Sequence, residues 1–283
     1  NILDFDNLTE ENIYVLDSPI LTNSQFKKFK NIFSKKLKII DCTFEINSPL
    51  KNRIEKIKTE SEIAVREGSS TLIMSDKNIS KSKASIPTIL AVGAVHSHLV
   101  KLGLRGYCSI NVESSDALDT HSFAILIGVG ATTINPYLAI DSIYQRFEKK
   151  LFGNSDFESC VLRFKKSIDA GLLKIMSKMG ISVISSYRGG CNFEAVGLSR
   201  AIVADYFPGM VSRISGIGIL GIEKKIKALH AKFSEKNVIV LPIGGLYKYR
   251  KTGEDHQYQG SLIHVLQHAV GTGSYEHYKK YSK

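Results

Sequence analysis

The sequence predicts an α/β fold with a largely parallel sheet and flanking helices. Two observations support this prediction. Short apolar segments alternate with longer segments whose apolar residues recur at helical spacing, which is typical of strand–helix units. The short segments are apolar on both faces, as strands are when helices cover a parallel sheet. The expected strands are too few for a closed eight-stranded barrel.

Strands and helices alternate over the first half of the chain. The expected strands are short apolar segments at Leu37–Phe44, Thr71–Ser75, Tyr107–Val112 and Ser122–Val129. After the first strand, Pro49–Arg66 has isoleucine and valine residues on one face and charged residues on the other, which predicts a helix. After the second, Pro87 suits a helix start, and Thr88–Leu102 is apolar around the turn.

The second half is predicted to be more helical. One helix is expected from Asn135 to about Lys150, and Gly180 ends a long amphipathic helix over Ser155–Met179. Ile181–Ser185 is a fifth expected strand. Further helices are expected near Asn192–Ala195, at Ser199–Asp205, at Gly221–Phe233 and from about Ser261. The Gly- and Ser-rich segment Phe207–Gly221 has no clear period, which predicts a boundary or linker.

Length and composition indicate a globular protein. The 283 residues, 43% hydrophobic and 23% charged, suit one large domain or two small ones. The apolar run Phe123–Val129 is far shorter than the roughly 20 residues that cross a bilayer. The opening Asn1–Asp6 is acidic, unlike a targeting segment. We expect a soluble cytoplasmic protein, or a plastid one in a photosynthetic eukaryote, and the absence of an initial Met is typical of a processed or excised piece.

Cysteine spacing and charge both favour simple interpretations. The cysteines are far apart and form no C-x-x-C pair, so we expect buried free thiols at Cys42, Cys108, Cys160 and Cys191. The net charge of +11 arises from lysines spread over several segments with few arginines. Spread lysines are typical of solvated faces rather than of a nucleic-acid footprint. We therefore expect neither a nucleic-acid nor a membrane partner.

Two polar clusters have residue types found in metal sites. His96 and His98 lie two residues apart on a predicted helix, about 200° around its axis, so they cannot chelate one ion. The second cluster is a loop that holds Glu113, Asp116, Asp119 and His121. A metal or acid–base site fits this loop, but acidic loop residues more often begin helices and turns.

Two glycine-containing segments are candidate ligand sites. Gly216-Ile217-Gly218-Ile219-Leu220-Gly221 matches G-x-G-x-x-G, with Glu235 at the distance of a ribose-binding acid. We reject a dinucleotide site because the preceding segment makes a poor strand. The turn Tyr187-Arg188-Gly189-Gly190 leads into a predicted helix at Asn192, where backbone amides and Arg188 suit an anion. A tight turn that needs positive φ explains the same glycines equally well.

Three stretches around this turn form a recognisable pattern: Ser177-Lys178-Met179-Gly180-Ile181-Ser182, Ser186-Tyr187-Arg188-Gly189 and Phe193-Glu194-Ala195-Val196-Gly197-Leu198. In these stretches the sequence resembles the glutamate synthase large (alpha) subunit family. Earlier stretches follow in the family's order, among them Ser75-Asp76, Ile86-Pro87, Ala91-Val92-Gly93-Ala94-Val95-His96, Leu104-Arg105, Gly130-Ala131 and Asn135-Pro136-Tyr137-Leu138-Ala139. The resemblance extends from about Pro19 to the last residue.

The resemblance implies a division of the chain. Residues 1–205 are similar to the family's central domain, 206–240 to a connector, and 241–283 to the incomplete beginning of the FMN-binding synthase domain. It implies that the central domain is a rudimentary, TIM-barrel-like version of the FMN domain that carries no flavin. An unfinished barrel exposes strand edges, so we expect the final segment to pack irregularly or to mediate oligomer contacts.

The resemblance also implies a role in nitrogen assimilation and glutamate biosynthesis. A parent glutamate synthase converts glutamine, 2-oxoglutarate and reductant to two glutamates, using an amidotransferase domain, FMN and an iron–sulfur cluster. The expected partners are the amidotransferase and FMN domains of the same polypeptide, with a reductase subunit or ferredoxin as electron donor. None of the four cysteines matches the family's nucleophile or cluster motifs. The chain is therefore expected to hold no catalytic, cofactor-binding or metal residue.

The implied role is to link the amidotransferase and FMN domains and to wall an ammonia path between them. The residues expected at that path, or at an interdomain surface, are Ser177, Lys178, Met179, Tyr187, Arg188, Asn135 and Tyr137. Plain packing against the FMN domain is the alternative for each. Two other function classes remain open: a stand-alone α/β barrel enzyme that binds a small anion, and a basic nucleic-acid-binding module.

Overall fold

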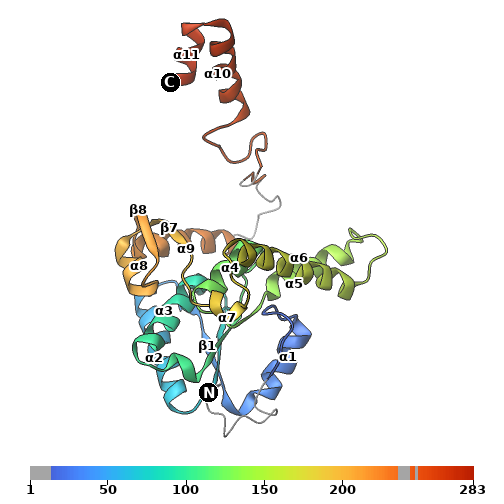
Figure 1. Cartoon of the computed structure of the whole chain (residues 1–283), viewed down its shortest axis with the longest axis vertical. Coiled ribbons are helices and arrows are strands. Elements are labelled where there is room, and N and C mark those ends of the chain that lie inside the picture. The colour runs from blue at the N-terminus through green and yellow to red at the C-terminus, as the bar shows by residue number, and fades with distance from the viewer. Residues whose placement is uncertain (1–13, 235–242, 246–247) are drawn as a thin grey trace. The chain divides into compact units, whose positions relative to one another are not determined.

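The computed structural model describes residues 14–234, 243–245 and 248–283. The chain divides into two compact units, residues 1–234 and 235–283, and each is described by itself. Figure 1 labels the elements of both. The proposed division into central domain, connector and FMN-domain beginning, which comes from the resemblance alone, stays a prediction.

The centre of the first unit is a four-stranded parallel sheet in the order β1-β3-β5-β6. The strands are β1 (Leu37–Asp41), β3 (Thr71–Ser75), β5 (Ser109–Glu113) and β6 (Thr133–Asn135). A parallel bridge between Ile20 and Ile134 adds one further contact at the β6 edge. Successive strands of this sheet are therefore neighbours, as the α/β prediction requires.

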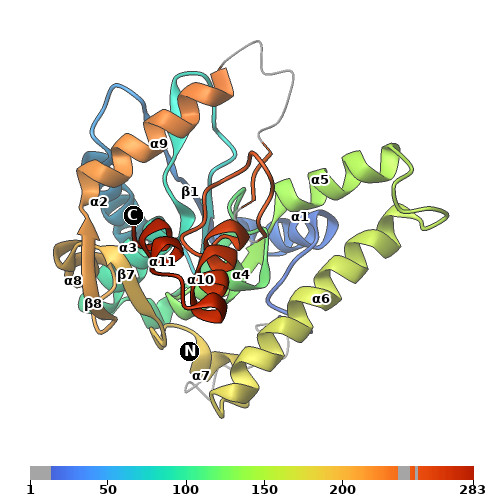
Figure 2. The same ribbon diagram turned by 90° about the horizontal axis from the view of Figure 1, so that it is seen from above.

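Helices connect these strands. They are α2 (Leu50–Arg66), α3 (Thr88–Lys101) and α4 (Thr120–Gly128), while α1 (Asn23–Ile32) precedes β1. Short 3-10 turns, η3 (Ser34–Lys36) and η4 (Arg105–Tyr107), lead into β1 and β5. After β6, α5 (Tyr137–Glu148) and α6 (Phe157–Lys178) pack on each other, and in Figures 1 and 2 they extend together away from the sheet.

Alternate residues of β3, an inner strand of the sheet, face two different hydrophobic cores. Leu72 and Met74 belong to the large core built with α2, α3 and α4, whereas Ile73 packs in a smaller one with Phe26 and Phe29 of α1. This alternation is the period of two that a strand imposes. The connecting helices therefore share one face of the sheet, which is the arrangement of consecutive strand–helix units in a barrel. The α/β prediction with flanking helices is confirmed.

Two shorter sheets complete the first unit. In one, β2 (Thr43–Glu45) pairs antiparallel with β4 (Lys83–Ser85), so the predicted strand Leu37–Phe44 is interrupted near Cys42. In the other, β7 (Glu194–Leu198) pairs parallel with β8 (Val211–Ile217), joined through α8 (Arg200–Tyr206). The helix α9 (Ile219–Ser234) follows β8.

Several sequence predictions were wrong locally. Ser122–Val129 is not a strand but most of α4, because a short apolar run does not distinguish a buried helix from a strand. The expected strand Ile181–Ser185 is a loop that enters the one-turn helix α7 (Ile184–Tyr187), and the helix expected at Asn192–Ala195 leads instead into β7. The segment Phe207–Gly221 contains β8 rather than a linker. The strand conformation of β7 and β8 depends on their pairing with each other, which is a tertiary contact that local sequence patterns do not show.

The described residues of the second unit contain two helices, α10 (Gly260–Thr272) and α11 (Tyr275–Ser282), which pack on each other. Gly273, with φ of 65°, ends α10, and the Ser274 hydroxyl caps α11 by accepting from the His277 amide. The helix expected from about Ser261 is thus present as two helices. In the parts of the chain that the structure describes, no helix has the length and apolarity needed to cross a membrane.

Candidate functional site

The carboxyl ends of the four parallel strands bring polar side chains together at one edge of the sheet. In α/β proteins this edge commonly holds the functional site. The residues at or just after the strand ends are Asp41, Ser75, Asp76, Glu113, Ser114 and Asn135. The hydrogen bonds and ion pairs of these side chains indicate whether they are available to a substrate.

Glu113, at the end of β5, is a buried carboxylate of this edge. Its side chain is 4% exposed, and Oε1 lies 2.9 Å from Nζ of Lys30 and 3.1 Å from Nζ of Lys77. The Ser75 hydroxyl donates to Oε2 at 2.7 Å. Burial acts to raise the pKa of Glu113, but the contacts from Ser75, Lys30 and Lys77 outweigh it and lower that pKa below its usual value. The carboxylate is therefore ionised and fully engaged within the protein.

Asp76 and Tyr137 meet beside this ion pair. Oδ2 of Asp76 accepts from the backbone amide of Ser115 at 2.9 Å and from its hydroxyl at 2.7 Å. Burial raises the pKa of Asp76 despite these bonds. Burial also raises the pKa of Tyr137, and the neighbouring Asp76 adds to that effect. The Lys77 ammonium lies 5.0 Å from the Tyr137 ring centroid.

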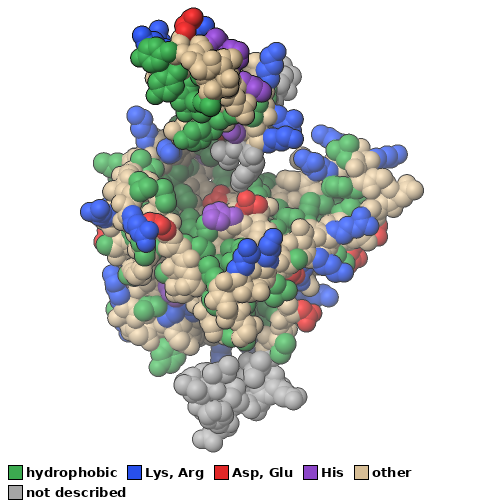
Figure 3. All heavy atoms as spheres, turned by 45° about the horizontal axis from the view of Figure 1, so that its top comes forward, with side chains coloured by type: hydrophobic (Ala, Val, Ile, Leu, Met, Phe, Trp, Pro, Cys, Tyr) green, Lys and Arg blue, Asp and Glu red, His purple; other side chains and the backbone are tan. Residues whose placement is uncertain are grey.

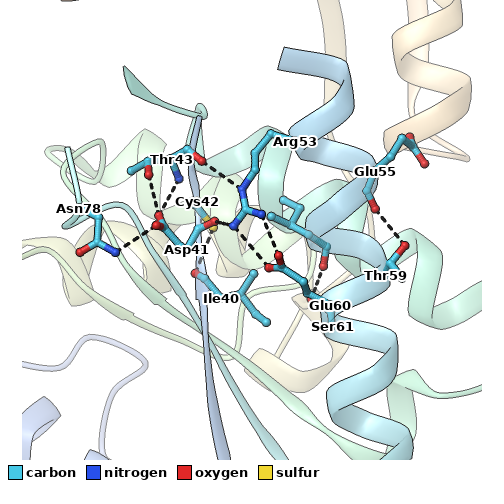
Figure 4. Close-up of polar contacts among 11 residues, drawn as sticks. Ile40, Asp41, Cys42, Thr43, Arg53, Glu55, Thr59, Glu60, Ser61 and Asn78 are labelled. Atoms are coloured by element: carbon cyan, nitrogen blue, oxygen red, sulfur yellow. Dashed lines mark hydrogen bonds and ion pairs between the residues drawn. The ribbon is translucent and has the colours of Figure 1, made fainter. Parts of the chain in front are cut away.

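Asp41 and Arg53 close the β1 corner of the edge (Figure 4). Asp41 accepts from the Thr43 amide at 2.9 Å and hydroxyl at 2.7 Å, and from Nδ2 of Asn78 at 3.0 Å. Arg53 reaches from α2 to donate to the carbonyls of Asp41 and Thr43, at 2.5 and 3.1 Å, and pairs with Glu60 at 2.8 Å. Burial acts to raise the pKa of Asp41, but hydrogen bonds from Asn78 and Thr43 lower it overall.

The acidic residues in the loop after β5 make structural hydrogen bonds. Asp116 accepts from the Thr88 amide at 3.0 Å, at the start of α3. Asp119 is the N-cap of α4 and accepts from the Ser122 amide at 2.9 Å. His121 is exposed. The helix-start interpretation of this loop is therefore confirmed for Asp119. Within the described ranges, no group of three or more His, Cys, Asp or Glu side chains is placed to hold a metal.

Two of the residues expected at an ammonia path lie at this carboxyl edge. Asn135 ends β6, and its Nδ2 donates to the Leu21 carbonyl at 3.0 Å and to Oδ1 of Asn23 at 2.9 Å. Tyr137 begins α5 next to Asp76. Both side chains therefore tie elements of the first unit together.

The turn that holds Tyr187 and Arg188 lies toward the opposite end of the sheet. Gly189, next to Tyr187 and Arg188, donates from its backbone amide to the carbonyl of Ile127, in the last turn of α4. That turn leads directly into the start of β6. Ser177 and Lys178 end α6 and are exposed, and the C-cap residue Met179 is 43% exposed. Asn135 and Tyr137 thus lie at the carboxyl ends of the strands, and the turn with Tyr187 and Arg188 lies toward their amino ends.

His96 and His98 have different partners, as their spacing predicted. Nε2 of His98 lies 2.9 Å from Oε2 of Glu62 on α2. Nδ1 of His96 accepts from Nε of Arg105 at 3.1 Å, near the amino end of the sheet. The two rings therefore share no partner among the described residues.

All four cysteines are free thiols, and Cys42, Cys108 and Cys160 are buried as expected. Cys191 is only partly buried. Burial raises the pKa of the Cys42, Cys108 and Cys191 thiols, which makes each a weaker nucleophile at neutral pH.

The glycine motif has the strand that we expected it to lack. β8 runs to Ile217 and α9 begins at Ile219, so our reason for rejecting the motif was wrong. The first glycine nevertheless has a packing explanation: a Cβ on Gly216 would lie 2.1 Å from the carbonyl oxygen of Gly197. Glycine here permits close approach of β7 and β8. Glu235, the proposed ribose-binding acid, lies outside the described residues.

An apolar cavity of about 350 Å³ lies between α3, α4 and the β7–β8 sheet. Its lining includes Leu90, Ile125, Phe193, Ile202, Phe207 and Met210. Cationic side chains, by contrast, are scattered over the visible face of the first unit rather than gathered in one patch (Figure 3). This scatter does not favour a nucleic-acid footprint.

Comparisons with known proteins identify close relatives. Residues 1–199 match the family model described as the glutamate synthase central domain. The whole chain is 50% identical to the glutamate synthase [NADPH] large chain of Azospirillum brasilense and covers 19% of it. It is 38% identical to that of Bacillus subtilis over 95% of this chain and 18% of the relative. It is 34% identical to the chloroplastic ferredoxin-dependent enzyme of Spinacia oleracea over 95% of this chain and 18% of the relative.

The chain therefore spans about a fifth of the length of the relatives that it matches. Among solved structures, DHODH from Eimeria tenella aligns with 54% of this chain and 37% of its own, at 12% identity and a TM-score of 0.36. A likeness of that size establishes nothing further.

Proposed function

The chain belongs to the glutamate synthase central-domain family, and from that premise we propose that it is a non-catalytic domain of a larger glutamate synthase polypeptide. In this proposal it links the amidotransferase and FMN synthase domains and walls the ammonia path between them. The parent enzyme would convert glutamine, 2-oxoglutarate and reductant to two glutamates. FMN and an iron–sulfur cluster would belong to its other domains, and NADPH or ferredoxin would supply electrons.

One observation carries the non-catalytic role. Two carboxylates at the carboxyl edge of the sheet are bonded to their own neighbours: Glu113 to Lys30 and Lys77, and Asp41 to Thr43 and Asn78. In a substrate site, some of these groups would face an open cavity. Here they connect strands, α1 and loops, which favours a structural domain.

The ammonia-wall role has a physical reason. Ammonia that meets bulk water becomes ammonium, which has no free electron pair and is no nucleophile, so a path between two active sites must exclude water. The exposed group, Ser177, Lys178 and Met179, is available to a neighbouring domain. We assign the wall to this group, because the side chain of Asn135 is already bonded within the first unit.

A stoichiometry measurement tests this role in the complete polypeptide. Met179→Trp places a bulky group at the proposed wall, and Leu173→Trp, at a 65% exposed position on α6, is the matched control. We expect Met179→Trp to release ammonia to solvent, so that glutamine hydrolysis exceeds glutamate formation while the control stays coupled. Unchanged coupling in both variants would overturn the assignment of Met179.

The size of the native polypeptide tests the domain role itself. We expect an antibody against this chain to detect a band several times larger than 31.4 kDa in source-cell extract. A band at 31.4 kDa would contradict the linking role unless separate subunits supplied both neighbouring active sites. Fractionation of the same extract tests the proposed cytoplasmic location, for which the chloroplastic relatives offer the alternative.

A further inference from the structure

We propose that Arg188, Arg105 and His96 form a binding site for a carboxylate group at the amino end of the parallel sheet. The cluster lies near the starts of β5 and β6 and is separate from the polar edge described above. This inference does not depend on the linking role of the domain.

Arg188 is a cation that has no counter-ion among the described residues. In the described part of the chain its guanidinium makes no hydrogen bond or ion pair, and its Nε is buried. Burial lowers the pKa of Arg188, although a guanidinium stays charged at neutral pH. A partly desolvated charge with unmet donors costs free energy unless an acceptor binds to it.

Arg105 places a second cation nearby. Its Nη1 and Nη2 donate to the carbonyls of Cys108 and Gly130, at 2.5 and 2.9 Å, and its Nε donates to His96. These acceptors are all neutral, and Arg105 has no carboxylate partner among the described residues. Burial lowers the pKa of Arg105, and the positive charge of Arg188 contributes to that shift. The two guanidinium groups therefore repel each other.

His96 adds a neutral donor. Since Arg105 only donates, Nδ1 of His96 must be the acceptor and Nε2 carries the hydrogen. Burial and the charge of Arg105 lower the pKa of His96 to about 4, so the ring is neutral at pH 7. A Cβ on Gly189 would lie 3.1 Å from Nε2. The Nε2–H group is thus beside the 188–190 turn, and it has no acceptor within the described residues.

A carboxylate fits this set of donors. The guanidinium fork of Arg188 matches the two oxygens of one carboxylate, and the Nε2–H of His96 offers a further hydrogen bond. Its negative charge would also offset the repulsion between Arg188 and Arg105. The carboxylate has two possible sources: a free carboxylic acid, or an Asp or Glu side chain from the rest of the polypeptide.

Arginine modification distinguishes these sources. The rate at which phenylglyoxal modifies Arg188 is followed by peptide mass spectrometry in this 283-residue chain and in the complete polypeptide. The added probes are sodium acetate, sodium 2-oxoglutarate and sodium phosphate, against sodium chloride at matched ionic strength. Arg146, exposed on α5, serves as the internal reference.

We expect acetate or 2-oxoglutarate to slow the modification of Arg188 several-fold in this chain and to leave Arg146 unchanged. If phenylglyoxal already modifies Arg188 slowly in the complete polypeptide without a probe, the carboxylate is a side chain of that polypeptide. If the probes are needed in both proteins, it is a free acid. Rates unaffected by carboxylates in this chain would overturn the proposal, as would protection by phosphate at lower concentration than by any carboxylate.

A thermal measurement gives a second test. Acetate should raise the Tm of this chain and of Arg146→Gln, but not that of Arg188→Gln. Arg188→Gln removes an unpaired charge, so we expect it to fold and to melt no lower than the parent chain without acetate. An equal acetate effect on all three proteins would contradict a site at Arg188.

Discussion

The Lys30 ammonium lies 2.9 Å from the Glu113 carboxylate, and this ion pair joins α1 to the end of β5 across 83 residues of sequence. Glu113 is 4% exposed whereas Lys30 is 30% exposed, so the carboxylate depends on the pair more than the ammonium does. Lys77 is a second partner at 3.1 Å. The consequences of removing either member are therefore unequal.

Glu113→Gln should destabilise the first unit by about 2 kcal/mol at pH 7, because it leaves two cations without their shared partner. Lys30→Met should cost less, since Lys77 remains beside the carboxylate. Urea unfolding at pH 7 measures both. Equal losses in the two variants would contradict the central position of Glu113 in this contact.

The lowered pKa of Glu113 fixes a pH dependence. A carboxylate with a folded-state pKa below its usual 4.5 stabilises the protein above that pH, and the stabilisation is lost as the pH falls below it. The difference in stability between the parent and Glu113→Gln should therefore shrink below about pH 4.5. Urea unfolding between pH 3 and pH 7 tests this, and a constant difference over the series would contradict it.

Protonation of His96 should affect the stability of the protein at higher pH, between about 4 and 6.5. Its folded pKa of about 4 lies below the usual 6.5, so the unfolded chain takes up a proton in this window and the folded chain does not. Stability should consequently fall as the pH drops from 6.5 toward 4, and His96→Gln should flatten that fall. His121→Gln, at an exposed histidine, is the control and should retain the parent slope.

Gly216→Ala should destabilise the β7–β8 sheet. The added Cβ would lie 2.1 Å from the backbone oxygen of Gly197, and backbone cannot move aside as a side chain can. We expect a loss of about 2 kcal/mol or more. Gly106→Ala, where no atom lies within 4 Å of the new Cβ, should change stability by less than about 0.5 kcal/mol. Comparable Tm values for the two variants would contradict this close approach.

Local patterns predicted most of the first unit because its long elements have clear periods. The helix expected at Pro49–Arg66 is present as Leu50–Arg66, and the strand at Thr71–Ser75 is present as predicted. In a short apolar segment, periodicity does not distinguish a helix from a strand, and Ser122–Val129 was misassigned for that reason. The strand β8 carries little apolar pattern and owes its conformation to pairing with β7.

The candidate site was less predictable than the fold. Resemblance identified Tyr187 and Arg188, and the loop composition identified Arg188 as an anion-site residue. No local signal links Arg105 or His96 to that turn, because the contacts arise only when α3, η4 and the 188–190 turn meet. Similarly, nothing in the sequence pairs Lys30 with Glu113.

The final prediction concerns α4, the helix that the sequence pattern misassigned. Its amino end is fixed by Asp119, whose Oδ1 accepts from the Ser122 amide at 2.9 Å and from its hydroxyl at 2.6 Å. Asp119→Ala removes this cap, and we expect a loss of about 1 kcal/mol in urea unfolding. Asp141→Ala, at an exposed position on α5, is the control and should change stability by less than about 0.5 kcal/mol. If Asp119→Ala matched its control, α4 would not depend on the cap, and burial of its apolar residues alone would select helix over strand.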